Sequence, residues 1–90
     1  MLYLVVESFK SQDLIEVSER FQSQGRLMPE GLAYIASWMT CDGSQCYQVM
    51  DSPNRQLLDV WISNWSDLVD FQVNQVESSA DFWNRFNKCQ

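Results

Sequence analysis

A chain of 90 residues with 46% hydrophobic and 13% aromatic side chains predicts a single domain with its own core and excludes a disordered segment. Twelve acidic residues against six basic ones give a formal net charge of −6. That balance excludes the clustered cations of a nucleic-acid-binding surface and disfavours binding to an anionic membrane.

The chain begins with an apolar run over residues 2–8, which predicts a strand covered on both faces. No positive residue precedes this run and Glu7 interrupts it, so we interpret it as a strand rather than a signal peptide. A cytoplasmic protein is therefore expected, and the odd number of cysteines, three, fits that compartment. Residues 14–21 then carry apolar side chains at helical spacing, and Gly25 is predicted to end this helix.

A loop over residues 26–32 leads into a predicted hairpin over residues 34–50. The hairpin contains an Asp-Gly pair, which favours a tight turn between two antiparallel strands. Strict alternation puts Tyr34, Ala36 and Trp38 on one face of its first strand, so both faces of the hairpin carry apolar groups.

A second helix is predicted to begin at a Ser52 cap with Pro53 in its first position, followed by a wide apolar stripe. Residues 71–77 alternate in polarity, which predicts a more exposed strand at an edge. Residues 78–90 are predicted to form a short helical extension of the one domain that spans residues 1–90. The aromatic side chains of this extension are Phe82, Trp83 and Phe86.

The order strand, helix, strand, strand, helix, strand predicts an α+β, ferredoxin-like fold. Its four-stranded antiparallel sheet should carry two helices on one face. The opposite face should be polar in a monomer, yet apolar side chains point there in either register of the hairpin. We therefore expect a homodimer through this face of the sheet. The aromatic segment 82–86 is a rival cover, either over its own sheet or across to the neighbour.

Histidine is absent, which removes the usual general base and the usual zinc and haem ligands, so no metal and no cofactor are expected. Cys41 and Cys46 flank the hairpin turn. They face each other at a disulfide-compatible spacing if Gly43 and Ser44 form its centre. If Asp42 and Gly43 form the centre, Cys41 faces Ser44 instead. We favour two reduced cysteines, given the compartment.

Four residues are candidates for the lining of a ligand pocket. Tyr34 and Trp38 are predicted as its walls, because alternation puts them on one strand face. Arg26 is a candidate polar anchor, with a surface ion pair as the alternative. Glu7 interrupts an apolar strand, so inside a cavity its pKa would rise and it could act as a base. The alternative is that Glu7 lies just past the buried part of the strand.

Four motifs resemble a known family: MLYLVVESF at the start, RLMPEGL in the loop, YIASW…DG…CYQVM in the hairpin and WSDLVDF late in the chain. They are similar to a bacterial family of proteins of about 90 residues that carries a domain-of-unknown-function label. The resemblance implies a ferredoxin-like fold in the dimeric α+β barrel superfamily, and it implies no known reaction. That superfamily includes cofactor-free monooxygenases and isomerase-like enzymes, so fold alone does not choose a function.

We predict a small homodimeric binding or accessory module that holds a small apolar or aromatic ligand on the sheet face. The missing histidine and the absence of a catalytic signature favour this over an enzyme. The alternative is a cofactor-free monooxygenase-like or isomerase-like enzyme that uses Tyr34, Trp38 and Glu7. RNA binding through an RRM-like sheet, with Tyr3 and Tyr47 stacking on bases, is disfavoured by the pI of 4.2.

Overall fold

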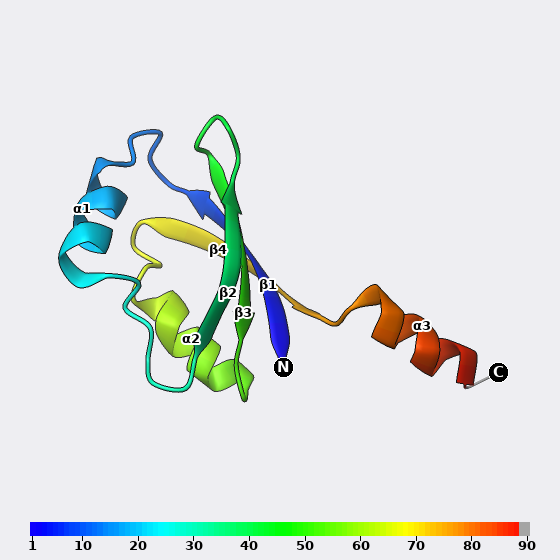
Figure 1. Cartoon of the computed structure of the whole chain (residues 1–90). Helices are drawn as coiled ribbons and strands as arrows, with labels where there is room; N and C mark the ends of the chain where they lie inside the picture. Colours follow the sequence, from blue (N-terminus) through cyan, green and yellow to red (C-terminus); the bar gives the residue numbers. More distant parts are fainter. Residues whose placement is uncertain (89–90) are drawn as a thin grey trace.

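The computed structural model describes residues 1–88 and has the predicted ferredoxin-like order (Figure 1). Four strands form one antiparallel sheet in the order β2-β3-β1-β4. Helices α1 and α2 cover one face of this sheet, and α3 follows the last strand. The elements are β1 (Leu2–Phe9), α1 (Ile15–Gln24), β2 (Ala33–Met39), β3 (Gln45–Asp51), α2 (Arg55–Ser63), β4 (Val69–Val76) and α3 (Ser79–Lys88).

The helix boundaries follow from local capping. Gly25 has a φ of 68° and its N–H bonds the Phe21 carbonyl at 2.8 Å, so it ends α1 as predicted. The predicted start of α2 at Ser52 is wrong. Asn54 is the cap, and its Oδ1 accepts a hydrogen bond from the Leu57 N–H at 2.8 Å. The Ser52 hydroxyl instead donates to the Asn54 carbonyl, which leaves Asn54 free to cap.

The hairpin turn is wider than a two-residue loop. The Thr40 N–H bonds the Gln45 carbonyl at 2.9 Å, and Met39 pairs with Cys46. The Asp42 carboxylate accepts hydrogen bonds from Ser44 inside this loop. Cys41 therefore lies in the turn and faces neither Cys46 nor Ser44, and both cysteines are free.

A β-bulge changes the faces of β2. Tyr34 pairs with Met50 and Ala36 with Val49, so Ile35 is an extra residue on this strand. Tyr34 therefore points to the helix-covered face, where its hydroxyl meets that of Ser37 at 2.7 Å. The predicted grouping of Tyr34 with Trp38 is wrong, because a bulge shifts the alternation by one residue.

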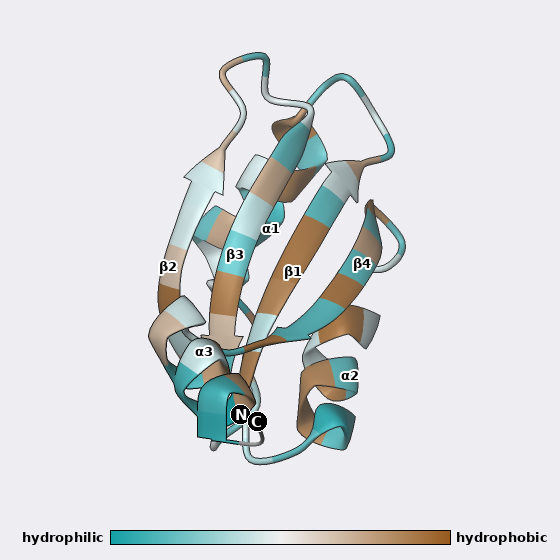
Figure 2. Ribbon diagram, turned by 90° about the vertical axis from the view of Figure 1, so that its right-hand side faces the viewer, coloured by the Kyte–Doolittle hydropathy of each residue, from teal (hydrophilic) through white to brown (hydrophobic). Residues whose placement is uncertain are grey.

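The core lies between the sheet and the two helices. On β1 the buried residues alternate with half-buried ones, so this strand is covered on one face and not on both faces as predicted. The main core side chains are Tyr3, Val5, Leu32, Met50, Leu58, Trp61, Trp65 and Val69. The other side of the sheet, which we call the open face, is not covered by α1 or α2, and α3 lies on this side but clear of the strands (Figures 1 and 2). Its apolar residues are Leu2, Leu4, Val6, Ala36, Trp38, Tyr47, Val49 and Val76.

The predicted C-terminal extension is helical over its described part, and its last two residues lie outside the described chain. Helix α3 stands clear of the sheet on the side away from α1 and α2 (Figure 1). No helix within residues 1–88 is long and apolar enough to cross a membrane.

Candidate functional site

A cleft of about 380 Å³ lies between the sheet and the two covering helices. Strands β1, β2 and β3 supply its polar floor, whereas α1 and the segment from α2 to β4 supply apolar walls. The floor residues are Glu7, Ser37, Cys46 and Gln48. The apolar lining is Phe9, Val17, Phe21, Met39, Trp61, Trp65 and Val69, and Arg26 enters from the loop after α1.

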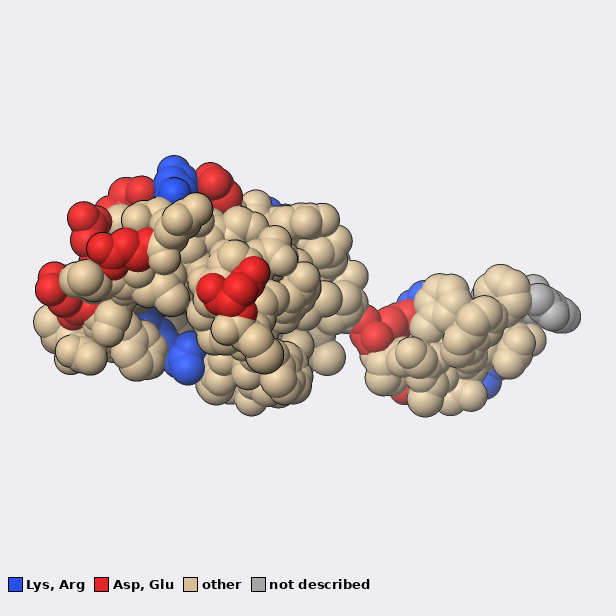
Figure 3. Space-filling view, turned by 90° about the horizontal axis from the view of Figure 1, so that it is seen from above, with Lys and Arg blue, Asp and Glu red and all other residues tan. Residues whose placement is uncertain are grey.

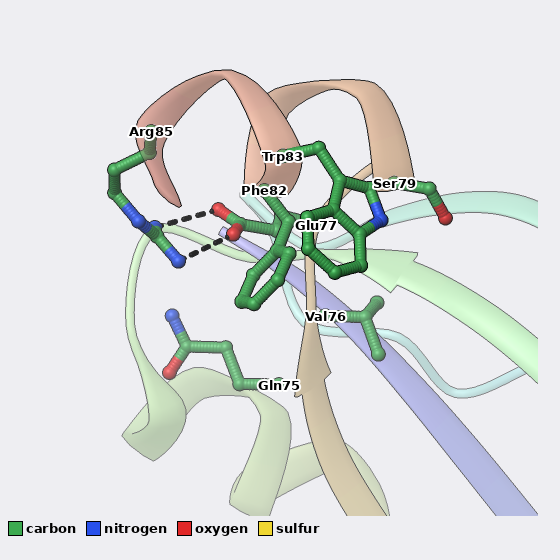
Figure 4. Close-up of a pocket in the computed structure, with 7 residues that line it drawn as sticks. All are labelled: Gln75, Val76, Glu77, Ser79, Phe82, Trp83 and Arg85. Atoms are coloured by element: carbon green, nitrogen blue, oxygen red, sulfur yellow. Dashed lines mark hydrogen bonds and ion pairs between the residues drawn. The ribbon is translucent and has the colours of Figure 1, made fainter. Parts of the chain in front are cut away.

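A larger hollow of about 590 Å³ lies between α3 and the end of β4 (Figure 4). None of its lining side chains is buried, and the Glu77–Arg85 ion pair already satisfies its charges. The cleft under the helices is smaller but contains buried polar groups in an apolar setting. It is therefore the better candidate for a small-molecule site.

Glu7 is the acidic residue that lines the cleft, and its pKa is strongly shifted. Strand alternation puts it on the same face as Tyr3 and Val5, and it is only 9% exposed. Burial raises the pKa of its carboxyl to about 7, although the Cys46 thiol and the Arg26 charge act in the opposite direction. The carboxyl therefore changes charge near neutral pH.

Cys46 faces Glu7 directly across the β1–β3 ladder. Burial, and then the neighbouring Glu7 charge, raise the pKa of its thiol to about 11. The thiol thus stays protonated at neutral pH, where it lies beside the Glu7 carboxyl and near the Ser37 side chain. Such a thiol is a poor nucleophile and acts as a hydrogen-bond partner.

Arg26 is held by its backbone and by two aromatic rings. Its carbonyl accepts hydrogen bonds from the indole N–H groups of Trp61 at 3.1 Å and Trp65 at 2.8 Å. Its guanidinium lies over the rings of Tyr34, at 3.7 Å from the centroid, and Phe21, at 5.4 Å. The cation is therefore positioned at the cleft with its apolar stem covered.

The chain turns sharply just after Arg26. Leu27 has a φ of 57°, which is unusual for a residue with a Cβ. The Asn64 side-chain amide donates to the Leu27 carbonyl at 2.9 Å and supports this conformation. The strained residue thus directs the preceding Arg26 toward the two indoles.

Of the four predicted pocket residues, the structure brings three together. Glu7 and Arg26 both line the cleft, and Tyr34 stacks against Arg26 at its edge. Trp38 lies on the open face, opposite Tyr47, and does not reach the cleft. The cleft thus lies on the helix-covered side of the sheet, whereas the predicted pocket was expected on the helix-free side.

Sequence reasoning missed several residues of the cleft. The pocket candidates named from the sequence include neither Cys46 nor the tryptophans Trp61 and Trp65. The alternation along β3 was the available signal, because it puts Cys46 and Gln48 on the same strand face as the apolar Met50. All three side chains are buried in the structure. Within residues 1–88, no three acidic or cysteine side chains gather as metal ligands would.

Comparison with known proteins gives a family and no activity. The model of a domain of unknown function, DUF3303, matches residues 1–89. No curated protein and no solved structure matches the chain. The resemblance noted from the four motifs is confirmed in its coarser part, the membership of a family of unknown function. The chain belongs to the DUF3303 family.

Proposed function

We propose that this protein is a binding module that holds a small aromatic ligand in the cleft between the sheet and the helices. The observation that carries the proposal is a cleft of about 380 Å³ whose walls are aromatic and aliphatic and whose polar groups gather on the floor. Small-molecule sites in proteins typically have this volume and this division of polarity.

The polar floor indicates the chemistry of the ligand. The Glu7 carboxyl is protonated or ionised near neutral pH, so it can donate to a carbonyl or accept from a hydroxyl. The Arg26 guanidinium adds a cation beside it. An aromatic ring with one hydroxyl or carbonyl group matches both the walls and the floor, and a fully apolar molecule would leave Glu7 without a partner from the ligand.

The test uses phenol, benzaldehyde and 1-naphthol as probes, with the thermal midpoint as readout. Binding to the folded state raises the midpoint with probe concentration. Val17→Trp fills the cleft from α1 and is expected to abolish the shift. Val60→Trp adds the same group on an exposed position of α2 outside the cleft and should retain it. No shift with any probe, or an equal shift in both variants, would contradict the proposal.

The second candidate is a cofactor-free enzyme of the monooxygenase-like or isomerase-like kind. A single observation favours it: a buried carboxyl with a pKa of about 7 can serve as a general base at neutral pH. In that case Glu7→Gln abolishes turnover while probe binding persists. In a pure binding module the same variant changes only the affinity, which separates the two candidates.

A further inference from the structure

Because of helix α3, the chain is less compact than expected for a folded monomer of 90 residues. The protein exposes 6089 Å², against about 5,500 Å² expected for a folded monomer of this mass. Its radius of gyration is 15.0 Å, against about 12 Å expected for 90 residues. Figure 3 shows α3 as a separate lobe joined to the body by a narrow neck. The chain therefore exposes surface that a compact monomer of this size would bury.

The helix needs a surface to pack against. It has ten residues, and an isolated helix of that length is marginal in water. Phe82, Trp83 and Phe86 contact one another with ring centroids 5.1 to 6.2 Å apart, and we call them the arm cluster. The two phenylalanine rings are stacked, and Trp83 meets both edge to face. Trp83 remains 54% exposed within this cluster. An occupant that covers the cluster would stabilise the helix as well.

The direction of α3 is set by its junction with β4. Only residues 77–78 separate the two elements. Arg85 pairs with Glu77 through two contacts, at 2.7 and 3.0 Å, and Figure 4 shows this bridge beside Phe82 and Trp83. A bidentate ion pair thus links the junction to the second turn of α3, and in this arrangement the helix lies away from its own sheet.

The open face of the same chain offers a matching apolar surface. Trp38 is 61% exposed and lies opposite Tyr47, and half-buried Leu4, Val6 and Val49 continue the patch across β1 and β3. The hydrophobic bands of β1 and β3 are visible in Figure 2. Such a patch is unusual on a monomer.

Charge also favours this match. Residues 78–88 contain two cations, Arg85 and Lys88, and one anion, Asp81. Residues 1–77 contain four cations and eleven anions. A weakly cationic arm is attracted to an acidic body, so one copy of the chain complements another.

We propose that a second copy of this chain covers the open face by exchange of α3. Each copy lays its arm cluster on the open face of the other, in a two-fold dimer. A second copy is favoured over a lid on its own sheet because the short junction and the Glu77–Arg85 bridge direct the arm outward. The proposal is independent of the ligand in the cleft, which lies on the other side of the sheet.

Sedimentation of the full chain between 1 and 100 µM tests the proposal. The unmodified protein should sediment as a dimer. Phe82→Asp in the arm and Trp38→Asp on the open face should each weaken dimerisation, by roughly 30-fold or more. Val60→Asp is the matched control, since Val60 is an exposed apolar residue on α2 and should leave the dimer unchanged. Circular dichroism establishes that each variant is folded.

A mixture of the two defective variants distinguishes exchange from a lid. The mixed dimer restores one contact, because the intact arm of the Trp38→Asp chain meets the intact face of the Phe82→Asp chain. Exchange thus predicts that the mixture dimerises more tightly than either variant alone. A monomeric unmodified protein, an arm variant that dimerises normally, or a mixture without recovery would overturn the proposal.

Discussion

Glu7 and Cys46 face each other across the β1–β3 ladder on the helix-covered side of the sheet, and the burial of this pair raises the pKa of both groups. One is a carboxyl that titrates near pH 7, and the other is a thiol that stays protonated until about pH 11. The pair places a single titratable proton donor or acceptor in an otherwise apolar cleft.

The first prediction concerns stability against pH. The folded-state pKa of Glu7 lies near 7, above its ordinary value of 4.5, so the folded state binds the proton more tightly than the unfolded state. Its contribution to the free energy of unfolding is fully present below pH 4.5 and is lost as the pH rises through 7, by about 3 kcal/mol in total. Urea unfolding at pH 5, 6, 7 and 8 measures this loss, and Glu7→Gln should flatten the dependence. An equal slope in that variant would assign the effect to other groups.

The second prediction concerns cysteine reactivity. At pH 8, iodoacetamide should label exposed Cys41 readily and leave Cys46 unmodified in the folded protein, because the thiolate is the reactive form. Peptide mass spectrometry resolves the two sites. Since the Glu7 charge raises the pKa of the Cys46 thiol, Glu7→Gln should speed the labelling of Cys46. Equal labelling of both cysteines in the unmodified protein would contradict the burial of Cys46.

The third prediction concerns the two indoles that bond the Arg26 carbonyl. Trp61→Phe and Trp65→Phe each remove one donor and should each lower the free energy of unfolding by roughly 1–2 kcal/mol. The double variant leaves the carbonyl without either indole, so its loss should exceed the sum of the two. Denaturant unfolding of the three variants measures the coupling, and simple additivity would show that the shared acceptor is unimportant.

The fourth prediction compares two glycines with positive φ. The added Cβ of Gly25→Ala meets no neighbouring atom, but Gly25 has φ 68° and ψ −151°, a backbone conformation nearly restricted to glycine, so the substitution should cost about 1–3 kcal/mol. Gly31→Ala adds a steric contact to the strain of a positive φ, because its Cβ would lie 3.2 Å from the Leu57 side chain, so it should be more destabilising. Thermal unfolding of the two variants ranks their stabilities. If Gly25→Ala is the more destabilising, the Leu57 side chain moves aside without an energetic cost.

The order of elements was predictable because each depends on local pattern. The apolar run of β1, the helical stripe of α2 and the glycine that ends α1 are readable from neighbours in the sequence. Glu7 was singled out for the same reason, since a carboxylate inside an apolar strand has to be explained, and the structure places it on the floor of the cleft. Its partner Arg26 was chosen without any evidence that the two would meet.

The faces of β2 could not be predicted from local pattern. An extra residue at Ile35 reverses the alternation, and nothing in the composition of the strand marks the bulge. As a result Tyr34 joins Arg26 at the cleft, and Trp38 goes to the open face. The prediction of a tight two-residue turn was wrong for a similar reason. Hydrogen bonds of the Thr40, Asp42 and Ser44 side chains support a wider loop.

The sequence alone determined the strand and helix order and the family, because periodicity, caps and motifs are local properties, whereas the burial of Glu7 was decided by the structure. Only the tertiary structure decided where the cleft lies, which residues share it and that α3 stands apart. Those features depend on register, on a bulge and on one ion pair at a junction, and these set distances between residues that are far apart in the chain.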